Sequence, residues 1–111
     1  FGDRDGVGDD ARFQHPLGVA WSAGRLFVAD TYNHKVRTVD PATGAVRTLA
    51  GTGEAGLADG TRASSRFYEP GGIAAANGAL YVADTNNHVI RRVALDAGRA
   101  DMVTTVDVFE R

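Results

Sequence analysis

The sequence repeats itself once at a constant offset of 54 residues. Residues 1–44 align with residues 55–98 without a gap, and 19 of these 44 aligned pairs are identical. A fixed period of this length indicates a duplicated supersecondary unit, and it lies closest to the periods of roughly 40 to 50 residues that propeller blades show. The chain is therefore predicted to fold as two copies of one small unit, residues 1–54 and residues 55–111.

Turn residues divide each unit into four short segments, which we interpret as strands. These segments span residues 17–21, 25–29, 35–39 and 45–50 in the first unit, and residues 72–76, 79–83, 89–94 and 101–106 in the second. Gly, Pro, Asn and Asp cluster between the segments, which is typical of turns between strands. No segment has apolar residues at helical spacing, and 14 of the 111 residues are Gly, so no helix is expected. The sequence thus predicts an all-β fold of two four-stranded antiparallel sheets.

The two units share one long motif across the second and third predicted strands. In the first unit the motif reads Leu26-Phe27-Val28-Ala29-Asp30-Thr31-x-Asn33-His34-x-Val36-Arg37, preceded by Phe13-x-x-Pro16-x-Gly18. In the second unit it reads Leu80-Tyr81-Val82-Ala83-Asp84-Thr85-Asn86-Asn87-His88-x-Ile90-Arg91, preceded by Phe67-x-x-Pro70-x-Gly72. These motifs resemble NHL repeats, the blades of six-bladed β-propellers. The resemblance implies a partial NHL propeller whose two blades are residues 1–54 and 55–111. The glycine-rich connection after Gly51 is similar to that of bacterial NHL proteins, including those that join a thioredoxin-like domain to the propeller.

A blade of this kind buries both of its faces against neighbouring blades. Residues 26–29 are apolar at every position, so we expect both faces of this strand to be covered. Two blades alone leave their outer faces bare, and about three or more repeats are needed for stability. The chain opens on Phe1 with no basic-then-apolar leader, so we expect a segment of a longer propeller in which the remaining blades lie in the same chain. The alternative is a homotrimer, since three copies would close into a ring of six blades.

The longest connections and the turns within the motif are predicted to share one end of the molecule. An antiparallel meander places residues 1–16, 30–35, 51–70 and 84–89 at this end, and long connections usually have a functional role or are disordered. We call this end the loop face, and it is the predicted binding surface. Its candidate binding residues are Asp30, Tyr32, His34, Lys35, Asp59, Arg62, Glu69 and His88.

Metal binding is a second hypothesis for the histidines. His34 and His88 occupy equivalent turns of adjacent blades, and a strand spacing of about 4.8 Å places these turns too far from the axis for both rings to reach one zinc ion. The motif is predicted instead to form a turn in which the Asp carboxylate accepts backbone N–H groups and the Asn takes a left-handed conformation. We assign this structural role to Asp30, Asn33, Asp84 and Asn87.

Two further metal sites are weighed and not assigned. Some NHL-propeller lyases hold zinc in the central channel, and this resemblance makes His15 and Glu69 candidates, but a zinc site needs three or four converging ligands. The acidic run from Asp3 to Asp10 suggests calcium, yet Val7 and Gln14 stand where an EF-type loop requires oxygen ligands. We therefore predict no metal ligand, and we regard the acidic run as a solvated turn.

The number and placement of the basic residues argue against nucleic acid as the partner. The chain has 12 basic and 14 acidic residues, a formal charge of −2, and acidic residues crowd the loop face, where they would repel phosphate. Arg37 and Arg91 repeat inside a strand, and we expect them to pair with carboxylates of a neighbouring blade. Trp21 stands opposite Ala75 in the repeat, so we expect it to fill space between blades.

The sequence favours a binding or scaffold module over an enzyme. No catalytic residue and no cofactor is assigned, and the absence of Cys excludes disulfides and thiolate metal sites. No apolar stretch is long enough to span a bilayer, and no residue pattern indicates a compartment. The expected partner is a protein or a covalently linked domain, such as a thioredoxin-like one, bound at the loop face. The alternatives are part of a metal-dependent propeller enzyme of the lyase or lactonase type, and an RNA-binding propeller.

Overall fold

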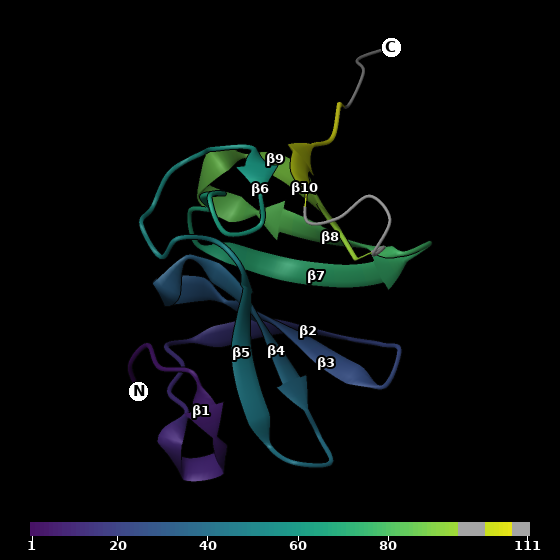
Figure 1. Cartoon of the computed structure of the whole chain (residues 1–111). Coiled ribbons are helices and arrows are strands. Elements are labelled where there is room, and N and C mark those ends of the chain that lie inside the picture. The colour runs from purple at the N-terminus through teal and green to yellow at the C-terminus, as the bar shows by residue number, and fades with distance from the viewer. Residues whose placement is uncertain (96–101, 108–111) are drawn as a thin grey trace.

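The computed structural model describes residues 1–95 and 102–107, which form two antiparallel sheets of five strands each (Figure 1). The first sheet has the order β1-β5-β4-β3-β2, from β1 (Gly6–Val7), β2 (Pro16–Ser22), β3 (Arg25–Asp30), β4 (Lys35–Asp40) and β5 (Ala45–Ala50). The second has the order β6-β10-β9-β8-β7, from β6 (Gly60–Thr61), β7 (Pro70–Ala76), β8 (Ala79–Asp84), β9 (Val89–Ala94) and β10 (Met102–Thr105). Three one-turn 3₁₀ segments complete the described elements: η1 (Gly8–Asp10), η2 (Thr31–Asn33) and η3 (Thr85–Asn87). The predicted all-β fold is confirmed.

The four-stranded meander of each unit lies where the turn residues predicted it. Residues 45–50 and 89–94 match strands β5 and β9 at both ends, and the other predicted strands that lie wholly in the described part differ by one or two residues at their ends. Of the last predicted strand, 101–106, residue 101 lies outside the described residues. No helix long and apolar enough to cross a membrane is found in the part of the chain that the structure describes.

Each sheet carries a fifth, outer strand that the sequence did not predict. The long connection before each meander folds back and pairs two residues with the outer strand of the same sheet, β1 with β5 and β6 with β10. A two-residue segment containing Gly has no alternation of apolar and polar residues, so it gives no strand signal. β1 pairs with the first residues of β5, Ala45 and Val46, beside the turn that follows Asp40, and β6 pairs with the first residues of β10. Residues 6–7 and 60–61 therefore lie at the end of the sheets opposite to the loop face, so the expectation that all of residues 1–16 and 51–70 lie on the loop face was wrong for these parts.

The core lies in the seam between the two sheets. Phe27, Val36 and Ala50 of the first sheet pack with residues of the second sheet, and all are buried; the second sheet and its preceding loop supply Phe67, Leu80, Val82, Val93 and Val103. Strand β7 lies against β2 and β3, so the innermost strands of the two sheets run next to each other (Figure 1). Phe27, Val28 and Ala29 are buried at consecutive positions of β3, as expected for a strand covered on both faces.

A glycine is required where the innermost strands approach most closely. A Cβ built on Gly18 of β2 would lie 2.1 Å from the carbonyl oxygen of Gly71 of β7. The equivalent residue of the second unit is Gly72, whose Cβ would meet only the Cβ of Ala83, at 3.7 Å. The first glycine therefore faces the seam, and the second faces away from it.

Candidate binding face at the loop end of the sheets

A buried ion pair holds the turn between β3 and β4. Arg37 Nη1 donates to Asp30 Oδ2 over 2.7 Å, and both side chains are 0% exposed. The same oxygen accepts the side-chain amide of Asn33 at 2.9 Å, while Asp30 Oδ1 accepts the backbone N–H of Gln14 at 2.8 Å. The ring of Phe13 lies 5.0 Å from the guanidinium carbon, a distance suited to a cation–π contact. Burial of these charges is tolerable because each has a close, hydrogen-bonded partner.

The second unit builds the same cluster from the equivalent residues. Arg91 Nη1 donates to Asp84 Oδ2 over 2.8 Å, and Asn87 donates to the same oxygen at 2.9 Å. Asp84 Oδ1 accepts the N–H of Tyr68, and the Phe67 ring lies 4.8 Å from the guanidinium carbon. The repeated motif is thus a structural device.

The buried arginines tie the long loops to the sheets. Arg37 donates to the backbone carbonyls of Arg4 and Arg12, at 2.8 and 3.0 Å. Arg91 donates to the carbonyls of Ala58 and Arg66, at 2.8 and 2.7 Å. Each loop is therefore fixed at two points by a charge-assisted hydrogen bond. Side chains projecting from these loops have a defined position relative to the sheet.

Two expectations about this cluster were wrong. His34, with φ 56°, and His88, with φ 60°, adopt the left-handed conformation; the asparagines preceding them do not. Asn33 is helical because its amide bonds both Asp30 and the carbonyl of Gly2, which leaves the chain reversal to the next residue. Arg37 pairs with carboxylates of its own sheet and its own preceding loop, not with a neighbouring blade.

Burial of both arginines also removes the basis of the RNA alternative. Arg37 and Arg91 are 0% exposed, so neither presents a cation to a phosphate. Phosphate contacts from Lys and Arg supply most of the affinity for nucleic acid. The repeated basic residues that suggested a phosphate-binding surface, Arg37 and Arg91, are buried inside the protein.

Asp5 links the outer loop, β4 and β5. Its carboxylate accepts bonds from Arg37 at 2.8 Å and from the N–H and the hydroxyl of Thr48, both at 3.0 Å. Partial burial raises the pKa of Asp5, but the bonds from Thr48 and the Arg37 guanidinium outweigh it, so the pKa is lowered from its ordinary value of 3.8. The ionised form is the one that the folded chain stabilises.

Acid is therefore expected to destabilise the chain partly through Asp5. Because its folded pKa is below the unfolded one, the unfolded chain binds more protons, so the contribution is complete above the unfolded value and is lost as the pH falls through the lower folded value. Asp5→Asn should flatten the fall in the midpoint of urea unfolding below pH 3.8. Equal acid sensitivity of the two chains would contradict this role.

The structure divides the predicted binding residues into two groups. Asp30 is buried in the first cluster, and Lys35 is buried against Asp3, to which its Nζ donates at 2.9 Å. Arg91 donates to Asp59 at 2.9 Å. Half-buried Arg62 donates to the carbonyl of Ala94 at 3.3 Å, at the end of β9 opposite to the loop face, so its predicted place on that face was wrong. The other four predicted residues are exposed or half-buried: Tyr32, His34, Glu69 and His88.

Two aromatic pairs stand on the loop face near the starts of the inner strands. The rings of His15 and Tyr32 lie 4.4 Å apart, and the rings of His34 and Tyr68 lie 5.6 Å apart with an edge-to-face tilt. Tyr32 is 46% exposed and Tyr68 is 39% exposed. Across the seam, His34 Nδ1 accepts the backbone N–H of Glu69 at 3.0 Å. We call His15, Tyr32, His34 and Tyr68 the aromatic ridge.

Sequence reasoning missed two members of the ridge as binding candidates. Tyr68 was not singled out, and His15 was weighed only as a zinc ligand. Their signal is a break in the repeat: Tyr68 stands opposite Gln14, and His15 stands opposite Glu69, within otherwise repeated turns. Residues that are identical in the two repeats hold the turn. Exposed residues that differ between the repeats are not needed for the turn, so they can contact a partner.

The acidic and imidazole groups do not converge on a common point within residues 1–95 and 102–107. No group of three or more His, Cys, Asp or Glu side chains there is placed to hold a metal ion. Of the two zinc candidates, His15 packs on Tyr32, and the N–H of Glu69 is bonded to His34.

Two sheets packed along one seam, each with its preceding loop pinned by a buried Arg–Asp pair, define a pair of adjacent propeller-type blades. The NHL repeat family model matches residues 13–38 and 67–92, the two copies of the motif. The chain belongs to the NHL-repeat family and carries two consecutive repeats.

Relatives and solved structures agree with this assignment. NHL repeat-containing protein 2 of Bos taurus is 53% identical over 98% of this chain, and the chloroplastic protein SUPPRESSOR OF QUENCHING 1 of Arabidopsis thaliana is 46% identical over 97%. The chain spans 15% and 10% of the lengths of these two proteins. An auxiliary nutrient binding protein from Bacteroides thetaiotaomicron has the same fold, with a TM-score of 0.78, 24% identity, and coverage of 96% of this chain and 26% of its own.

Proposed function

We propose that this pair of blades is a binding module that presents the aromatic ridge to a protein partner, either separate or covalently linked. The observation that carries the proposal is the combination of exposed tyrosines with a pinned framework. Tyr32 and Tyr68 are exposed, yet the backbone N–H of each is bonded: that of Tyr32 donates to the carbonyl of Gln14 and that of Tyr68 to Asp84 Oδ1. Aromatic side chains held in place contribute large contact area at low entropic cost, and they are enriched in protein interfaces.

The framework residues support the same reading. Asp30, Lys35, Asp59 and Arg91 are engaged in ion pairs that fasten the loops. Their charges serve the fold, so recognition falls to the groups that remain at the surface. A ridge of tyrosine and histidine suits an extended peptide or the edge of a folded domain, because the rings supply apolar area and hydrogen bonds together.

A peptide library displayed on phage tests the proposal. Peptides selected on the chain should lose about tenfold or more in affinity on Tyr68→Ala or Tyr32→Ala, the loss expected of an interface hot spot. Arg47→Ala, an exposed residue of β5, is the matched control and should leave the affinity unchanged. Selected peptides whose binding ignores both tyrosines would contradict the proposed face.

A further inference from the structure

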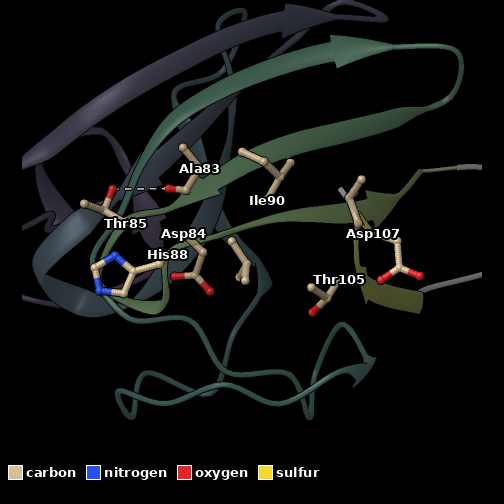
Figure 2. Close-up of a pocket in the computed structure, with 9 residues that line it drawn as sticks. Ala83, Asp84, Thr85, His88, Ile90, Thr105 and Asp107 are labelled. Atoms are coloured by element: carbon tan, nitrogen blue, oxygen red, sulfur yellow. Dashed lines mark hydrogen bonds between the residues drawn. The ribbon is translucent and has the colours of Figure 1, made fainter. Parts of the chain in front are cut away.

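The open groove on the outer side of the second sheet is a packing surface and not a ligand site. Thr85 and Ile90 line this groove (Figure 2). Their equivalents in the first sheet are Thr31 and Val36, which are 4% and 0% exposed because the second sheet lies on them. The groove has the shape that sheet packing requires, so we assign it no ligand.

A hollow of different character lies at the end of the seam opposite to the loop face. It has a volume of about 280 Å³ and is lined mainly by polar side chains: Arg25, Thr38, Asp40, Thr43 and Arg47. A second hollow of about 360 Å³ shares Arg25 and Thr38 with the first and continues to Arg62 and Leu95 of the second unit. We call the two together the arginine hollow.

The strand register turns the lining side chains of the first sheet toward the second sheet. Phe27, Thr38 and Arg47 stand opposite one another on β3, β4 and β5, and Phe27 belongs to the core of the seam. Arg25 lies two residues before Phe27, so it projects from the same face of the sheet. Toward this end β4 and β5 run away from the second sheet (Figure 1). The apolar core therefore stops at Phe27, and the arginines line the space beyond it.

The arginines of the hollow have no carboxylate partner within the part of the chain that the structure describes. Arg25 and Arg47 are exposed and Arg62 is half-buried, and the described ion pairs include none of the three. Asp40 is the one acidic residue among those that line the hollow. Three guanidinium groups and one carboxylate leave the hollow positively charged, so it attracts anions.

Thr38 adds a hydroxyl group on the floor of the hollow. It is 7% exposed and lines both parts, and its side chain has no hydrogen-bond partner among residues 1–95 and 102–107. Polar groups that are nearly buried are usually hydrogen-bonded. A bound molecule that reaches the floor would supply the missing partner.

The second unit shows that the sheet does not need these residues. Ala79 stands where the first unit has Arg25, and it is 1% exposed at the start of a strand of the same length. Arg92 stands where the first unit has Thr38. The arginine at position 25 therefore makes no contribution that the repeat requires, which points to a ligand of the first unit alone.

We propose that the arginine hollow binds a small molecule through a phosphate monoester group. The guanidinium groups of Arg25 and Arg47 donate to the phosphate oxygens, a geometry in which arginine forms two parallel hydrogen bonds. The Thr38 hydroxyl donates to a third oxygen, and Asp40 accepts a bond from a hydroxyl group of the same molecule. The volumes of the two hollows lie near the lower end of the range for small-molecule pockets, which begins at about 300 Å³. The hollow and the aromatic ridge lie at opposite ends of the sheets, so either proposal can fail without the other.

Titration of the ¹⁵N-labelled chain tests the proposal, with inorganic phosphate and glycerol 3-phosphate as probes and sodium chloride holding the ionic strength constant. The N–H resonances of Thr38 and Arg47 should shift with a Kd of about 1 mM or lower, while those of Tyr32 and Tyr68 stay in place. Glycerol 3-phosphate should bind more tightly than inorganic phosphate because its hydroxyl groups reach Asp40. Unchanged resonances up to about 20 mM of either probe, or equal shifts with chloride alone, would overturn the proposal.

Variants of the lining residues identify the groups that hold the phosphate. Arg25→Ala and Arg47→Ala should each raise the Kd for glycerol 3-phosphate about tenfold or more, the loss expected when a charge-assisted hydrogen bond is removed. Arg4→Ala removes an exposed arginine that does not line the hollow, so it is the matched control and should leave the Kd unchanged. Asp40→Asn should tighten the binding of inorganic phosphate, because it removes a like charge. Equal affinities of Arg47→Ala and Arg4→Ala would overturn the proposal.

Discussion

Replacing Asp30 with alanine is expected to lower the free energy of unfolding by about 3 to 5 kcal/mol, the cost of removing one partner of a buried ion pair. Arg37 would keep Asp5 as a counter-ion, but that carboxylate is 48% exposed. Arg37 is 0% exposed, and Asp30 is its buried counter-ion. The substitution also removes the acceptor for Asn33 and for the N–H of Gln14. Urea unfolding followed by circular dichroism measures the loss.

A double variant separates the ion pair from general damage to the turn. Asp30→Leu with Arg37→Met replaces both charges by apolar groups, and such replacements of a buried pair are often neutral or stabilising. The double variant should therefore be more stable than either single one. A loss below about 1 kcal/mol for Asp30→Ala would show that the pair does not hold the loop.

Gly18→Ala is expected to destabilise the chain by about 3 kcal/mol, because overpacking against rigid backbone forces the two sheets apart. The added Cβ would lie 2.1 Å from the carbonyl oxygen of Gly71, far inside contact distance. Neither atom belongs to a flexible side chain that could turn away. Thermal unfolding of dilute protein measures the change.

Gly72→Ala is the matched control for this prediction. It makes the same chemical change at the equivalent position of the repeat, where only ordinary contact results. Its stability should stay within about 0.5 kcal/mol of the parent. Equal losses for the two variants would mean that the inner strands do not form the seam described here.

The strands were predictable from this sequence because the turn chemistry is local. Gly, Asn and Pro mark the ends of the predicted strands, and the duplication gives most of these boundaries twice. Strands β1 and β6 were not predictable, since their pairing depends on a long loop folding back onto β5 and β10. A two-residue strand has no pattern of its own.

The repeated Asp and Arg of the motif were visible in the sequence, but their partnership was not. Asp30 and Arg37 lie on adjacent strands of one hairpin, and the pairing with a neighbouring blade that we expected would have been equally compatible with the repeat. The other partners of Arg37 are backbone carbonyls, which leave no trace in side-chain identity. Only part of the candidate site was predicted from the sequence. Tyr32 was predicted because it lies within the repeated motif, whereas Tyr68 lies outside the motif, where the first copy has Gln14.

The central claim is that the two sheets are joined across the seam by a hydrogen bond to the imidazole of His34. A nuclear magnetic resonance measurement of scalar coupling across that hydrogen bond tests the claim most directly. In dilute, ¹⁵N-labelled protein, the N–H of Glu69 should show scalar coupling to Nδ1 of His34, which accepts its bond across the seam. No such coupling should appear at Nδ1 of His88, whose face is open in the single chain. Absence of the coupling at His34, or the same signal at both histidines, would contradict the account.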